Sequence, residues 1–175
     1  NDYEKHLMDK AKHRFEGFSK EKKLTLSKNI TAGLPGASEK LTFQEVKRRL
    51  EGYSGIDADK LRENLKYFLD AVVPTAEKLG VRLCCHPDDP PWPLLGLPRI
   101  MSTEEDYNWL VNIHPSKANG ITFCTGSLGA SFENDLPGMV SRLGQHIHFL
   151  HLRNVTRERE SIPTSFYEDE HLSGN

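Results

Sequence analysis

The chain has 175 residues, enough for a sizeable hydrophobic core, and its composition shows no break that argues for two unrelated domains. The formal net charge of −2 excludes a general electrostatic attraction to nucleic acid or to an anionic membrane. No apolar run approaches the ~20 residues that span a bilayer, and the N-terminus NDYEKHLMDK has no signal-peptide pattern. We therefore expect a soluble cytoplasmic protein with no nucleic-acid or membrane partner.

The first third of the chain predicts helices. Charged residues alternate with spaced apolar ones over residues 3–18 and 20–30, which gives each helix a narrow apolar stripe. The sequence GLPGAS at residues 33–38 breaks this pattern, and residues 42–52 predict one more short helix. We interpret residues 1–56 as a helical insertion or arm.

The clearest helix is predicted over residues 60–79, where apolar side chains recur with the helical period. Asp57 and Asp59 are alternative caps for its start, and Gly80 is placed to end it. Pro74 lies inside the pattern and is expected to kink or divide the helix. A strand over residues 81–86 follows at once.

The proline-rich loop after this strand leads into a second helix and strand. Ser102 with Glu105 has the pattern of a capping box for a helix that runs to about Ile113. A strand is predicted over residues 121–124, followed by TGSLGA, which we interpret as a glycine-bearing loop.

A third helix and strand complete the pattern, over residues 135–143 and 147–151. The tail, residues 152–175, is polar and reads as irregular. Because helices and strands alternate, the economical topology is a parallel sheet with right-handed crossovers, so the fold class is α/β.

Each of the three predicted strands ends at a potential metal ligand: His86, Cys124 and His151. In parallel α/β folds, ligands bind at the C-terminal ends of strands. Two imidazoles and a thiolate suit a divalent first-row metal, without choosing between Zn²⁺, Mn²⁺ and Fe²⁺. The alternative for each histidine alone is an ordinary hydrogen-bonded residue.

Side chains alternate between the two faces of a strand, so neighbouring residues on these strands are expected to face opposite sides of the sheet. Cys84 and Cys85 point to opposite faces of their strand, and we expect both to be small buried residues with reduced thiols. In the last strand the period of two places His146 and His148 on one face and His151 on the other.

Polar residues beside these ligands are further candidates. Asp88 and Asp89 can contact a second group, orient His86 or form a turn. Arg153 offers a bidentate fork to a carboxylate, or forms a surface ion pair. His171 is a candidate acid or base, or a solvated residue of the tail. TGSLGA matches no nucleotide-binding pattern, and we assign no nucleotide.

Four segments resemble one family, the mannonate dehydratases. They are NITAGLPGAS at residues 29–38, HPDDPPWPLLGLPRI at 86–100, NGITFCTGSLG at 119–129 and HFLHLRN at 148–154. HPDDPP followed by GLPRI is a highly specific signature, and the likeness runs through essentially all of the chain.

The resemblance implies a TIM barrel related to xylose isomerase and the dehydration of D-mannonate to 2-keto-3-deoxy-D-gluconate in hexuronate (glucuronate) catabolism. It implies Mn²⁺ or Fe²⁺ as cofactor, with His86, Cys124 and His151 as its ligands. We take Asp88, Arg153 and Asn154 as candidate substrate-binding residues, and Arg153 and His171 as candidate catalytic residues. A homo-oligomer is expected.

The resemblance covers part of a barrel only. A whole barrel needs ~200 residues or more, so we expect residues 57–175 to form a partial (β/α)8 barrel that carries the metal site. The family's further aspartate ligand and adjacent catalytic histidine, found in a PDHG-like motif, have no counterpart in this sequence. Two alternatives are a sugar isomerase or epimerase of the same barrel superfamily, and an inactive fragment that retains a metal or ligand site.

Overall fold

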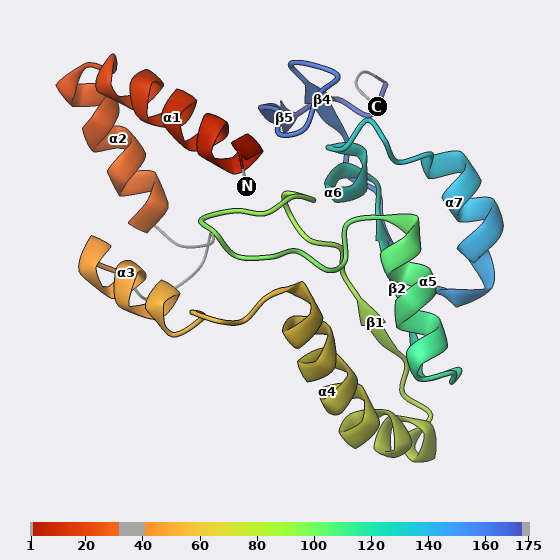
Figure 1. The fold of residues 1–175 in the computed structure, drawn as a ribbon. Helices are drawn as coiled ribbons and strands as arrows, with labels where there is room; N and C mark the ends of the chain where they lie inside the picture. Colours follow the sequence, from red (N-terminus) through yellow and green to blue (C-terminus); the bar gives the residue numbers. More distant parts are fainter. Residues whose placement is uncertain (1, 32–40, 173–175) are drawn as a thin grey trace. The chain divides into compact units, whose positions relative to one another are not determined.

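The computed structural model describes residues 2–31 and 41–172, and the chain forms two compact units, Asn1–Ser54 and Gly55–Asn175 (Figure 1). The expected break at residues 33–38 lies outside the described residues. Within the described part of the chain, no helix combines the length and the apolar character needed to cross a membrane.

The first unit is helical, as predicted. Its helices are α1 (Asp2–Glu16), α2 (Lys20–Thr31) and α3 (Phe43–Glu51). A capping box starts α3, because the Glu45 N–H donates to Thr42 Oγ1 at 3.2 Å and the Thr42 N–H donates to Glu45 Oε2 at 2.7 Å. Several apolar side chains of α1 and α2 stay exposed, including Met8 and Leu24.

The second unit alternates helices and strands in the predicted order. Its elements are α4 (Ala58–Leu79), β1 (Leu83–Cys85), α5 (Glu104–Ile113), β2 (Asn119–Cys124), α6 (Thr125–Gly129), α7 (Leu136–Leu143), the 3₁₀ turn η1 (Gly144–His146), β3 (Ile147–His151), β4 (Val155–Arg157) and β5 (Phe166–Glu168). Strands β1, β2 and β3 pair in parallel in the order β1-β2-β3. The prediction of an α/β fold with a parallel sheet is therefore confirmed.

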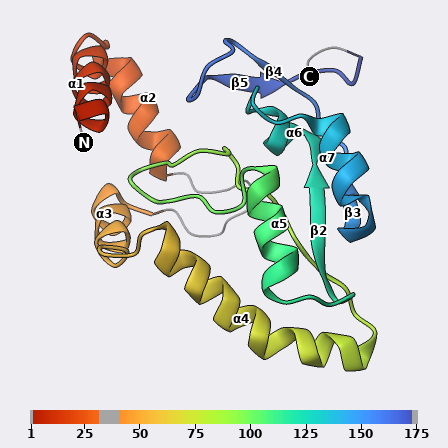
Figure 2. The same ribbon diagram turned by 45° about the vertical axis from the view of Figure 1, so that its right-hand side comes forward.

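Four helices share their core with one face of this sheet, and Figure 2 shows α5 and α7 beside β2. On β2 this face carries Ile121 and Phe123, both essentially inaccessible to solvent. The buried side chains that the helices contribute are Leu69, Val73 and Ala76 from α4, Tyr107, Leu110 and Val111 from α5, Leu128 from α6, and Met139 and Leu143 from α7. The alternate residues of β2, which end in Cys124, point to the opposite face.

A β-bulge changes the parity of β3. Ile121 pairs with Ile147, but Thr122 pairs with Phe149, so His148 is an extra residue on β3. The His148 ring lies against Gly120, which shares its face of β2 with Cys124. His148 and His151 therefore lie on the same face, and the prediction from strict alternation was wrong because it allowed for no bulge.

Gly120 is expected to be essential for this packing. A Cβ added at Gly120 would lie 2.3 Å from His148 ring atoms and 2.7 Å from the His146 carbonyl oxygen. We expect Gly120→Ala to lower the free energy of unfolding by about 1–3 kcal/mol because the site is overpacked, as measured by urea denaturation. Gly144→Ala is the matched control: its φ is −50° and no described atom lies within 4 Å of the added Cβ, so a loss as large there would contradict this explanation.

Local expectations for the helices are met in part. Asp57, rather than Asp59, caps α4, and its Oδ1 accepts from the Lys60 N–H at 2.8 Å. Helix α4 continues through Pro74 as one element, so of the two expected effects of Pro74, a kink or a division, the division is wrong. The capping box of α5 is one residue later than predicted, because Thr103 and Asp106 form it.

Three other expectations about local structure are corrected. The first strand is shorter than predicted and leaves His86 just beyond its last hydrogen-bonded residue. TGSLGA is not a loop: its first residues form α6, because Cys124 occupies the N-cap. The tail is not wholly irregular, since β4 and β5 pair as antiparallel strands.

Candidate metal centre

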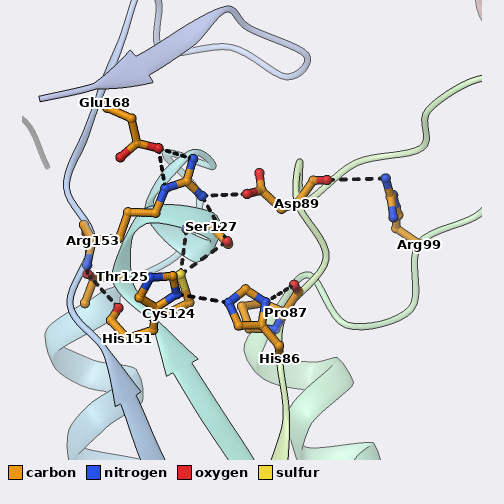
Figure 3. Close-up of polar contacts among 10 residues, drawn as sticks. All are labelled: His86, Pro87, Asp89, Arg99, Cys124, Thr125, Ser127, His151, Arg153 and Glu168. Atoms are coloured by element: carbon orange, nitrogen blue, oxygen red, sulfur yellow. Dashed lines mark hydrogen bonds and ion pairs between the residues drawn. The ribbon is translucent and has the colours of Figure 1, made fainter. Parts of the chain in front are cut away.

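The three predicted ligands converge at the C-terminal edge of the sheet. His86 follows β1, Cys124 ends β2, and His151 ends β3 directly opposite Cys124 in the parallel register. One ligand atom from each residue lies within 4.8 Å of the others, and Figure 3 shows the two imidazoles beside the sulfur. The parallel sheet thus brings together residues that are far apart in the chain.

The backbone fixes the proton on His86. Its Nδ1 lies 2.8 Å from the Pro87 carbonyl oxygen, which only accepts, so Nδ1 carries the hydrogen. In the neutral imidazole the other nitrogen, Nε2, has a lone pair and faces His151, whose Nδ1 is 3.2 Å away. This is the orientation in which a histidine binds a metal while its other nitrogen is held by a carbonyl group.

The spacing of these atoms fits one shared cation. Two nitrogens each about 2.1 Å from an ion lie about 3.0 to 3.4 Å apart when the angle at the ion is about 90 to 110°. The observed separation of 3.2 Å between His86 Nε2 and His151 Nδ1 falls in this range. Since both imidazoles are exposed and only Cys124 is buried, the donor set leaves positions open to an incoming ligand.

Cys124 is held by the first turn of α6. Its sulfur accepts the Ser127 N–H at 3.4 Å and lies 3.3 Å from Ser127 Oγ, and both residues are buried. Thr125 ties this turn to β3: its Oγ1 donates to the Arg153 carbonyl oxygen and accepts the Arg153 N–H at 3.0 Å. The positions of Cys124 and His151 are thereby linked through the backbone.

The other two cysteines differ from the expectation that both are buried. Cys84 is exposed because it pairs with Gly120, on the face away from the helices. Cys85 is half-buried, and burial, together with the nearby Asp88 and Cys84, raises the pKa of its thiol from 9.0 to about 11. Burial therefore favours the protonated thiol of Cys85, which is not one of the three residues whose ligand atoms converge.

Asp88 holds the proline-rich loop together. Its Oδ2 accepts the N–H groups of Ile100 and Met101 at 2.8 and 2.7 Å, and its Oδ1 lies 3.4 Å from Arg99 Nη1. Its backbone N–H also donates to the Met101 carbonyl oxygen. Asp88 thus closes the loop that begins at His86, while the neighbouring Asp89 faces Arg153.

Arg153 is bound by two carboxylates. Its Nη1 donates to Asp89 Oδ2 at 2.5 Å, and its Nε donates to Glu168 Oε1 at 2.6 Å (Figure 3). The Arg153 side chain is only 18% exposed, which makes this more than a solvated surface pair. Nη1 also donates to Ser127 Oγ at 3.3 Å, so the guanidinium reaches the residue that contacts the Cys124 sulfur.

A pocket of about 680 Å³ lies beside Arg153. Thr125, Arg153, Asn154 and His171 are among its lining residues. The amide nitrogen of Asn154 donates to the Glu170 carbonyl oxygen, and Asn154 is buried. His171 is exposed, and the contact between Asn154 and the neighbouring Glu170 holds this part of the tail near Arg153.

Sequence reasoning missed several residues that shape this site. Thr125 and Ser127 were hidden in TGSLGA because it was interpreted as a loop. The signal that was available is a cysteine followed three residues later by serine, at the N-cap and N3 positions of a helix. No local pattern indicated Glu168, whose contact with Arg153 depends on the β4–β5 pairing.

The fold and the site together define an α/β protein with a candidate metal centre at the carboxyl edge of its parallel sheet. Residues 2–175 match the family model of D-mannonate dehydratase (UxuA). The chain belongs to this family, and the resemblance inferred from the sequence motifs is confirmed.

Individual relatives agree with this assignment. The chain is 50% identical to mannonate dehydratase 1 of Agrobacterium fabrum over 173 residues and 49% identical to mannonate dehydratase of Rhizobium meliloti over 174 residues, in each case across 99% of this chain. It spans 43% of the length of each of these two relatives. A crystal structure of mannonate dehydratase from Streptococcus suis matches 72% of this chain and 36% of its own, with 39% identity and a TM-score of 0.66.

Proposed function

We propose that the protein is a metal-dependent hydro-lyase that converts D-mannonate to 2-keto-3-deoxy-D-gluconate in hexuronate breakdown. The observation that carries this proposal is the convergence of His86, Cys124 and His151, whose ligand atoms lie within 4.8 Å of one another. These residues would hold Mn²⁺ or Fe²⁺. Membership of the D-mannonate dehydratase family supports the choice of substrate.

We propose further that residues 57–175 contribute part of a (β/α)8 barrel and that residues 1–56 form a helical insertion. Three features support this: the strands are parallel and sequential, the helices pack on one face, and the opposite face carries exposed side chains such as Cys84 and Phe149. In a barrel the latter face would be the interior, and the candidate metal centre would lie at the catalytic end.

A divalent cation bound here would polarise an oxygen of the sugar acid and so acidify the proton alpha to its carboxylate. Because His86 and His151 are exposed, their side of the site would stay open to the oxygens of the substrate. Side chains of the enzyme must then remove that proton, assist loss of the hydroxyl at the next carbon, and hold the carboxylate.

Arg153 is our candidate for holding the substrate carboxylate. Its guanidinium already contacts Asp89 and Glu168, so the substrate would have to replace one of these acceptors. Glu168 is the better candidate for release because its side chain is 66% exposed, compared with 40% for Asp89. Bidentate geometry makes arginine suited to such an exchange of carboxylates.

His171 is our candidate for proton transfer, and its place beside Arg153 in one pocket supports this role. Asp88 and Asn154 would act on the substrate through the segments they hold, since their side chains already bind backbone groups. The cytoplasmic location and the homo-oligomeric state expected from the sequence stay predictions.

Metal removal tests the proposed reaction. We expect protein stripped by a chelator to lose turnover of D-mannonate by more than about 100-fold, because the cation supplies the Lewis acid, and to regain it with Mn²⁺ or Fe²⁺. The product is measured by the carbonyl chemistry of a 2-keto-3-deoxy acid. A product of unchanged mass would instead identify an isomerase or epimerase, and metal-loaded protein without turnover would favour the inactive fragment.

A further inference from the structure

We propose that Ser127 is a positioning residue for the metal-binding sulfur, and that Arg153 sets the direction of its hydroxyl group. This inference rests on the proposed metal centre and adds to it residues outside the ligand set. The feature that carries it is a continuous chain of polar contacts that runs from Asp89 and Glu168 through Arg153 and Ser127 to Cys124 (Figure 3).

The contacts of Ser127 are few and buried. Its side chain is 0% exposed, and its Oγ lies 3.3 Å from Cys124 Sγ and 3.3 Å from Arg153 Nη1. Its backbone N–H points at the same sulfur from 3.4 Å. Two groups of one residue therefore converge on the Cys124 sulfur.

The two partners of Ser127 Oγ limit the direction of its hydroxyl hydrogen. A guanidinium only donates, so Ser127 Oγ must accept from Arg153 Nη1. A Cys124 thiol donates to Ser127 Oγ, whereas a Cys124 thiolate can only accept, so in the thiolate form the Ser127 hydroxyl donates to the sulfur together with the Ser127 N–H. Two hydrogen bonds accepted by the sulfur stabilise its thiolate form, and the thiolate is the form that binds metals.

The position of Arg153 is itself constrained. Asp89 and Glu168 hold its guanidinium at 2.5 and 2.6 Å. Gly126 leaves room for its aliphatic stem, because a Cβ there would lie 2.4 Å from Arg153 Cγ. Since these contacts fix the side chain from both ends, its Nη1 is held toward Ser127.

Hydrogen bonds to a thiolate withdraw charge from the sulfur and orient its lone pairs. A cation bound to Cys124 would therefore be held in one geometry and stay more electrophilic than with an unsupported thiolate. Ser127 would act on the cation only through Cys124, which distinguishes it from a ligand.

The test uses Co²⁺ as a spectroscopic probe in the purified, metal-stripped protein. In Ser127→Ala we expect Co²⁺ to bind about 10–100-fold more weakly and the thiolate-to-cobalt charge-transfer absorption to move to longer wavelength. Ser127→Thr, which keeps the hydroxyl, should restore the wild-type wavelength. Ser141→Ala removes an exposed hydroxyl that contacts the Pro137 carbonyl oxygen, and it should leave both measurements unchanged.

The outcomes separate this inference from the proposed metal centre. Wild-type protein that binds Co²⁺ without sulfur absorption would overturn the centre itself, and the role of Ser127 with it. Wild-type affinity and wavelength in Ser127→Ala would overturn the role of Ser127 alone. If circular dichroism shows that Ser127→Ala does not fold, Arg153→Met replaces it: a shift to longer wavelength supports the inference, and an unchanged band overturns it.

Discussion

Replacement of Cys124 by serine is expected to abolish stoichiometric metal binding and to reduce turnover of D-mannonate by more than about 100-fold. Cys124 is the buried member of the candidate ligand set and lies opposite His151 in the sheet register. Loss of a direct ligand should cost more than the 10–100-fold typical of an outer hydrogen-bonding partner. Metal content by atomic emission and product formation on the same preparation provide the measurement.

Cys84→Ser is the matched control for this substitution. Cys84 is an exposed thiol on the neighbouring strand and shares the sheet face with Cys124, but it is not part of the ligand set. Its replacement should leave the metal content unchanged. Full metal content in Cys124→Ser would contradict the assignment of the sulfur as a ligand.

Asp88→Ala is expected to destabilise the protein by about 2–4 kcal/mol. The carboxylate accepts two backbone N–H groups, of Ile100 and Met101, in a part-buried position, and alanine would leave both donors without this partner. Urea denaturation followed by tryptophan fluorescence measures the change, and Trp92 lies in the affected loop.

The contacts of Asp88 also predict how stability should differ among related variants. Asp88→Asn keeps an oxygen acceptor and should lose less stability than Asp88→Ala. Asp59→Ala removes a carboxylate whose side chain is 92% exposed and should change stability by less than about 0.5 kcal/mol. Equal stability of Asp88→Ala and wild type would show that Asp88 does not hold the loop.

The main elements of the second unit follow from patterns that sequence makes visible. Long amphipathic helices and short apolar strands differ in period, so α4, α5 and α7 and the three parallel strands were predicted close to their observed limits. Sequential parallel strands place their ends at one edge, and this predicted that His86, Cys124 and His151 would meet. The topology of the sheet was therefore enough to predict this convergence.

The errors have a different origin. The bulge at His148 depends on how β3 fits β2, and alternation within one strand contains no information about its neighbour. The β4–β5 pair has only three residues in each strand, too few to show a hydrophobic period. It is stabilised by contacts between separate segments, such as Val155 and Phe166 with Trp92, and Thr156 Oγ1 with Asp169 Oδ2 at 2.5 Å. The carboxylates around Arg153 come from separate segments, so its environment required the tertiary structure.

The hydroxyl of Thr125 contacts both the N–H and the carbonyl group of Arg153, and so fastens the end of β3 to the start of α6 without help from a cation. The proposed metal site is thus assembled in advance, and little conformational entropy would remain to be lost when an ion enters. Exchange of one divalent ion for another would then leave the framework unaltered. Occupancy in a cell would follow the supply of each ion and the innate preferences of nitrogen and sulfur donors.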